Sequence, residues 1–134
     1  MKLLELDFYL DNIRILGIIA IVIGMGAWVM DWMGWVYVCP FCRVQRTTIA
    51  LLGLFMTLPH TNHLIIRYVT CIFGFFGIGV ASAQHFLGWV AIQKGEKTGL
   101  TEQWWIDSWM LSFFAICIII AQVWLVFLNK NEAK

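Results

Sequence analysis

The chain has 134 residues, of which 61% are apolar and 13% charged, whereas an ordinary soluble domain is roughly 45–50% apolar and about a quarter charged. A soluble core of this size could not bury so much apolar surface, so we expect an integral membrane protein in contact with lipid. Nine basic and eight acidic side chains give a net charge of +1, which excludes the strongly basic surface of a nucleic-acid-binding protein.

Four apolar stretches have about the length that crosses a bilayer, roughly 20 residues. They cover residues 13–35, 42–58, 64–85 and 105–128. Backbone groups cannot stay unpaired in lipid, so each stretch should be a helix. No cleavage site follows the first stretch, which we interpret as a retained span and not as a signal peptide. The links are short, and we therefore predict an all-α fold: an integral membrane four-helix bundle forming one domain over residues 1–134.

The distribution of basic residues weakly favours placing both termini on the inner side. This arrangement puts five basic residues inside and four outside, in agreement with the positive-inside rule. The inner set is Lys2, Arg14, Arg67, Lys130 and Lys134, and the outer set is Arg43, Arg46, Lys94 and Lys97. The margin widens if Arg43 and Arg46 are held in place by function.

Aromatic residues gather at the predicted outer interface. All tryptophans except Trp124 fall at or near it. They form either an aromatic belt at headgroup depth or a flat apolar surface for a partner protein or a ring-shaped cofactor. Between the third and fourth spans, Phe86–Gln103 is half apolar and half charged, which predicts a segment lying along the membrane surface. This segment contains no cysteine.

The sequence Cys39-Pro40-Phe41-Cys42 stands where the second span begins. Proline suits the first position of a helix, so Cys39 should be its N-cap and both sulfurs should lie near its positive end, where a thiolate is stabilised. Arg43 and Arg46 each follow a cysteine by four residues and share its helix face. Such a turn favours thiol–disulfide exchange. A structural role for Arg46 would instead pair it with Asp31 or Asp107.

Other roles for the cysteine pair have less support. A structural zinc site needs about four ligands, and Cys71 and Cys117 lie in mid-span, where they resemble small buried apolar residues. A structural disulfide closing so short a loop gains little entropy. We therefore favour a redox-active pair, predict no metal site, and keep a metal-handling membrane protein as a third possibility.

His85 closes the third predicted span. It is either an interfacial histidine bonded to water or backbone, or a proton donor or acceptor beside the cysteine pair. In the same span, Gly77/Ala81 and Gly79/Ala83 match the small-xxx-small pattern of closely packed membrane helices.

The run Cys39-Pro40-Phe41-Cys42-Arg43-Val44-Gln45-Arg46, together with Gln84-His85 at the outer end of the third span, resembles the DsbB family of quinone-dependent disulfide-generating membrane proteins. The resemblance implies a bacterial inner-membrane protein with its cysteine pair on the periplasmic side and a lateral helix in the second outer loop. It also implies that Cys39 exchanges with an incoming thiol and that Cys42 faces a ubiquinone or menaquinone, with Arg46 and His85 at the quinone site.

The chain departs from that family in one respect. Family members usually carry a second cysteine pair in the second outer loop, which passes oxidising equivalents to a periplasmic thioredoxin-like protein, whereas Phe86–Gln103 has none. Either a partner thiol attacks the Cys39–Cys42 disulfide directly, or the chain is a non-catalytic accessory subunit of a larger membrane complex. Both alternatives remain open from the sequence.

Overall fold

The computed structural model describes residues 2–36, 39–96 and 108–129. A short 3₁₀ turn, Lys2–Leu4, precedes the helices. The α-helices are α1 (Leu6–Asp11), α2 (Ile13–Trp32), α3 (Pro40–Thr57), α4 (Leu64–Gln93) and α5 (Ser108–Leu128). Within these residues every regular element is a helix, which confirms the all-α prediction.

Three helices of the described part are long and apolar enough to cross a membrane: α2, α4 and residues Trp109–Leu128 of α5. The exposed surface of α2, for example, is covered by isoleucine, valine and methionine side chains. Many of the buried side chains in the described part of the protein are polar instead: Asp31, Gln45, Thr48, Thr61, Thr70, Gln84, Ser112, Gln122 and Asn129. Apolar surfaces with polar side chains inside are typical of helices in lipid.

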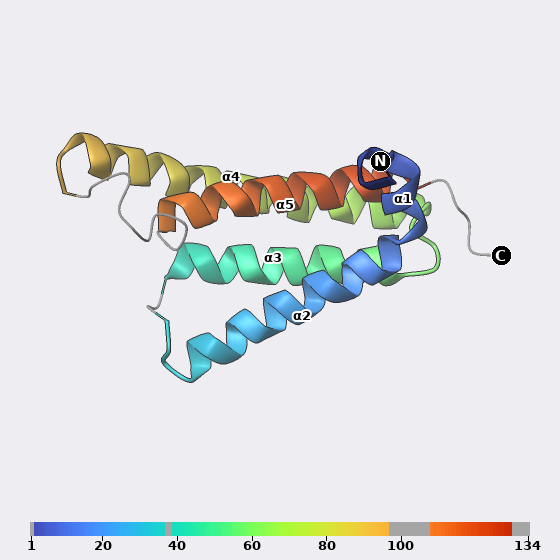
Figure 1. Ribbon diagram of the computed structural model, residues 1–134, viewed down its shortest axis with the longest axis horizontal. Coiled ribbons are helices and arrows are strands. Elements are labelled where there is room, and N and C mark those ends of the chain that lie inside the picture. Colours follow the sequence, from blue (N-terminus) through green and yellow to red (C-terminus); the bar gives the residue numbers. More distant parts are fainter. Residues whose placement is uncertain (1, 37–38, 97–107, 130–134) are drawn as a thin grey trace.

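The long helices run alternately in opposite directions, and α3 contacts α2, α4 and α5 (Figure 1). We call the end where α2 and α4 finish and α3 begins the cysteine end. At the opposite end, α1 packs against α2 and α5. Because α3 has three helical neighbours, side chains at its first turn can be reached from both α2 and α4.

Two glycines in left-handed conformation end the helices at the cysteine end. Gly34 (φ 72°) follows α2, and Gly95 (φ 75°) follows α4. In each case the glycine N–H and the next N–H donate to carbonyls of the last helical turn, which is the Schellman arrangement. The first predicted span therefore ends three residues early, at Trp32.

The predicted end of the third span at His85 is wrong, because α4 continues to Gln93. No proline and no left-handed glycine interrupts the helix before Gly95. The first part of Phe86–Gln103, which we expected to lie along the membrane surface, is therefore the last two turns of α4. Residues 97–107, which include the rest of that segment, the start of the predicted fourth span and Asp107, lie outside the described residues.

Small residues set the spacing of the helices. A Cβ on Gly53 of α3 would lie 2.7 Å from the carbonyl oxygen of Gly17 in α2, and a Cβ on Gly77 of α4 would lie 2.6 Å from Cγ2 of Thr48. Ala81, one turn after Gly77, is fully buried. The Gly77/Ala81 prediction is thus confirmed. The Gly79/Ala83 prediction is wrong, because a Cβ built on Gly79 would have no atom of another helix within 4 Å and Ala83 is exposed.

Gly77→Leu should destabilise the protein by about 1–3 kcal/mol relative to Gly79→Leu, because the added side chain meets Thr48 in a packed interface. Both substitutions bring the same gain in helix propensity, so their difference reports packing alone. Thermal unfolding in detergent measures it. Equal unfolding temperatures would contradict the close contact between α3 and α4.

Candidate redox site

The first turn of α3 holds the cysteine pair. Cys39 is the N-cap with an extended backbone (φ −123°, ψ 116°), Pro40 occupies the first turn, and the sulfur of Cys39 accepts a hydrogen bond from the Cys42 N–H at 3.4 Å. This confirms the cap position predicted from Pro40. Both cysteines are free thiols and partly buried. The two sulfurs therefore lie at the positive end of the helix, where its free N–H groups favour negative charge.

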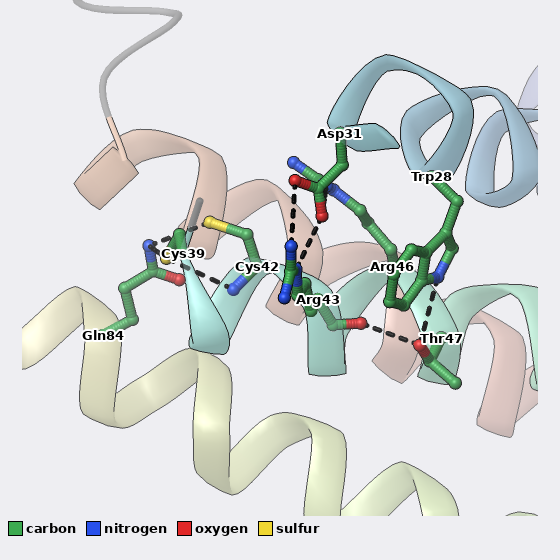
Figure 2. Close-up of polar contacts among 8 residues, drawn as sticks. All are labelled: Trp28, Asp31, Cys39, Cys42, Arg43, Arg46, Thr47 and Gln84. Atoms are coloured by element: carbon green, nitrogen blue, oxygen red, sulfur yellow. Dashed lines mark hydrogen bonds and ion pairs between the residues drawn. The ribbon is translucent and has the colours of Figure 1, made fainter. Parts of the chain in front are cut away.

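Gln84 of α4 brings a hydrogen-bond donor to both sulfurs (Figure 2). Its Nε2 lies 3.5 Å from Sγ of Cys42 and 3.7 Å from Sγ of Cys39. Gln45 of α3 donates from its own Nε2 to Oε1 of Gln84 at 2.5 Å, which orients the Gln84 amide. Both glutamines are buried, with 5% and 8% of Gln45 and Gln84 exposed. One amide thus serves two sulfurs and is itself held by a second amide.

Gln84→Leu should slow the reaction of the cysteine pair with a maleimide about tenfold or more at fixed pH, because a hydrogen bond to a thiolate contributes about 1.5–3 kcal/mol. Gln93→Leu is the matched control, since Gln93 lies on the same helix and is exposed. Equal alkylation rates in the two variants would mean that the amide does not act on the sulfurs.

The two arginines of α3 bind Asp31 of α2 and not the sulfurs (Figure 2). Arg43 donates from Nε and Nη2 to the Asp31 carboxylate at 2.7 and 3.3 Å, and Nη1 of Arg46 lies 3.4 Å from the same carboxylate. The Asp31 side chain is fully buried, whereas 41% of Arg43 and 19% of Arg46 are exposed. One carboxylate faces two guanidinium groups, so the cluster keeps one net positive charge.

From the sequence, a structural role for Arg46 could have paired it with Asp31 or with Asp107. In the structure, Arg46 pairs with Asp31. Arg43 also lies over the ring of Trp28, at 5.8 Å from its centroid. The cluster therefore ties α2 to α3 directly behind the cysteine turn.

His85 faces α5 and not the cysteine turn. Its Nδ1 lies 2.7 Å from the carbonyl oxygen of Trp109, and its Nε2 accepts from the indole N–H of Trp89 at 3.0 Å. These two bonds require a neutral ring protonated at Nδ1. Consecutive helix residues point about 100° apart, so Gln84 faces α3 while His85 faces α5. A role for His85 toward a cofactor stays a prediction.

The remaining cysteines differ from each other. Cys71 is partly buried, but Cys117 is exposed on α5, so the prediction that both are buried is wrong for Cys117. Its mid-span position places that exposed side toward lipid. Among the residues that the structure describes, no three histidine, cysteine or acidic side chains group together as metal ligands.

Fold and site together define a membrane-associated helical protein with a capped cysteine pair beside a buried amide. No protein-family model, curated protein or solved structure matches the chain.

Proposed function

We propose that the chain is a four-helix membrane thiol–disulfide oxidoreductase of the DsbB type. It would pass electrons from a thiol partner through Cys39 and Cys42 to a membrane quinone. The observation that carries this proposal is the shared Gln84 donor, 3.5 and 3.7 Å from the two sulfurs at the N-terminus of α3. In this proposal α3 is the fourth span, its arginines being neutralised in part by Asp31.

The reaction starts from a Cys39–Cys42 disulfide. A partner thiolate attacks Sγ of Cys39, a new disulfide forms between them, and Cys42 leaves as a thiolate. A second thiolate of the partner then attacks the partner's own sulfur in this mixed disulfide, so that the partner becomes oxidised and Cys39 leaves as a thiolate. The two protons that the partner thiols gave up would return the cysteines to a dithiol. This dithiol would then supply two electrons and two protons to a quinone, giving a quinol and restoring the Cys39–Cys42 disulfide.

The described contacts support these steps in different ways. The Gln84 amide donates toward either leaving thiolate, and the Cys42 N–H donates toward Cys39. The Asp31 cluster keeps one net positive charge, and its Arg46 follows Cys42 by about one helical turn. Since Phe86–Gln103 supplies no second cysteine pair, Cys39 would receive the partner thiol directly.

The proposed location follows from the same reaction. Oxidising equivalents for secreted proteins are needed outside the cytoplasm, so the cysteine end would face the periplasm of a bacterial inner membrane. The termini would then lie on the cytoplasmic side. A periplasmic thioredoxin-like protein fits as the thiol partner, and ubiquinone or menaquinone as the electron acceptor.

A second candidate function is that of a non-catalytic accessory subunit in a larger membrane complex. The observation in its favour is the exposure of Trp32 and Trp35, 81% and 68%, beside the cysteine end. Large exposed aromatic side chains are common at interfaces, although an aromatic belt uses them equally well.

Arg46→Ala should raise the KM for a soluble quinone analogue about 10–100-fold, the effect of losing one charge-assisted hydrogen bond. Arg46→Lys should recover part of it, because lysine keeps the charge but loses the planar fork. Arg14→Ala, at an exposed position far from the cysteine end, is the control. If Arg46→Ala lowers thermal stability but leaves KM unchanged, Arg46 serves only to pair with Asp31.

A further inference from the structure

A groove of about 230 Å³ runs between α3 and α4 from the cysteine end toward the middle of the helices. Its lining residues are Arg43, Val44, Thr47, Thr48, Leu51, Phe73 and Phe76. From Arg43 to Leu51 the α3 backbone rises about 12 Å. Phe76 forms one wall and is 58% exposed, so the groove opens sideways to the lipid. Its length and apolar walls suit a hydrocarbon chain.

Arg43 lies at the mouth of this groove. Arginine has five N–H donors, and Arg43 donates two hydrogen bonds to Asp31. Its side chain remains 41% exposed, so a ligand can reach part of it. The charge is also incompletely balanced, because Arg46 shares the same single carboxylate. The mouth of the groove therefore favours an anion, and Arg43 can bind a phosphate oxygen through directed hydrogen bonds.

A second groove, between α4 and α5, shows why the charge matters. It is larger, about 520 Å³, and is lined by apolar residues and Cys71 with no charged side chain. Such a surface accepts any hydrocarbon chain. Of these two grooves, the one at Arg43 joins an apolar channel to an incompletely balanced cation at one end.

We propose that the α3–α4 groove binds one anionic phospholipid of the surrounding bilayer, with its phosphate on Arg43 and an acyl chain against Phe73 and Phe76. Arg43 belongs to the Asp31 cluster as well as to the groove, but the proposal does not depend on the thiol chemistry. Charge complementarity selects the headgroup, and the apolar groove holds the chain.

Native mass spectrometry in detergent tests the site with phosphatidylglycerol and phosphatidylcholine of identical acyl chains. We expect the protein to retain one phosphatidylglycerol molecule and to prefer it to phosphatidylcholine about tenfold or more. A preference of this size is the expected effect of one added charge-assisted contact. Arg43→Gln should abolish the preference, and Val44→Phe should prevent retention by filling the groove. Arg14→Gln removes the same charge elsewhere and should change nothing.

Val44→Phe keeps the test decisive if Arg43→Gln fails to fold, because it leaves the Arg43–Asp31 pair intact. Unchanged retention of phosphatidylglycerol in Val44→Phe would overturn the proposal. Equal retention of the two lipids by the unaltered protein would also overturn it, as would displacement of the lipid by an equimolar short-chain ubiquinone, which would identify the groove as a quinone site.

Discussion

Replacing Cys42 with serine should trap a stable mixed disulfide between Cys39 and a thiol protein in the membrane of living cells. This variant cannot form the Cys39–Cys42 disulfide, so Cys39 reacts in the reverse direction: its thiolate attacks the disulfide of the oxidised partner, and one partner sulfur leaves as a thiolate. The Cys42 thiolate that would break the resulting mixed disulfide is absent. The cap geometry supports this role of Cys39, because the Cys42 N–H donates to Sγ of Cys39. Non-reducing electrophoresis followed by mass spectrometry identifies the adduct and its cysteine.

Two controls make the trapping result specific. Cys39→Ser/Cys42→Ser should trap nothing, and Cys71→Ser should behave like the unaltered chain because Cys71 lies in mid-span. If Cys42→Ser traps no protein but the chain co-purifies stoichiometrically with a large membrane complex, the accessory-subunit function is correct and thiol exchange is not its role.

Asp31→Asn should cause a larger loss of thermal stability than Gly77→Leu. The substitution leaves two neighbouring guanidinium groups without a carboxylate, next to an apolar helix surface where unpaired charge is costly. Asp11→Asn is the matched control, since Asp11 is exposed at the opposite end. Thermal unfolding in detergent measures both variants.

The double variant Asp31→Asn/Arg43→Gln should recover much of this stability, because it removes one of the two uncompensated charges. If Asp31→Asn unfolds at the same temperature as Asp11→Asn, the ion cluster does not hold α2 to α3. The double-variant comparison separates loss of the ion pair from local disturbance at Asp31.

Features set by local chemistry were predictable from the sequence. Pro40 in the first turn of a helix fixed Cys39 as its cap, and the apolar runs located the long helices to within a few residues, except at the end of α4. That end was also readable, because Lys94-Gly95 is an ordinary helix stop. Phe86–Gln103 mixes apolar and charged residues, however, and this pattern equally fits a segment on the membrane surface.

Features set by helix rotation were not predictable in the same way. Whether Gln84 or His85 meets the sulfurs depends on about 100° of rotation of α4, which only its packing against α3 and α5 determines. The choice of Asp31 as partner for both arginines likewise depends on how α2 lies beside α3. In the sequence, both Asp31 and Gln84 are polar residues within an apolar run, which indicates that each faces the interior of the bundle. This pattern does not identify their partners.

Anaerobic mixing of the fully reduced, purified protein with a ubiquinone or menaquinone analogue tests the central claim most directly. Quinone absorbance and the number of free thiols are followed together. The account predicts that one quinone is reduced for each pair of thiols lost, and that Cys39→Ser and Cys42→Ser each abolish the reaction. Quinone reduction that is absent, or that persists without these cysteines, would contradict it.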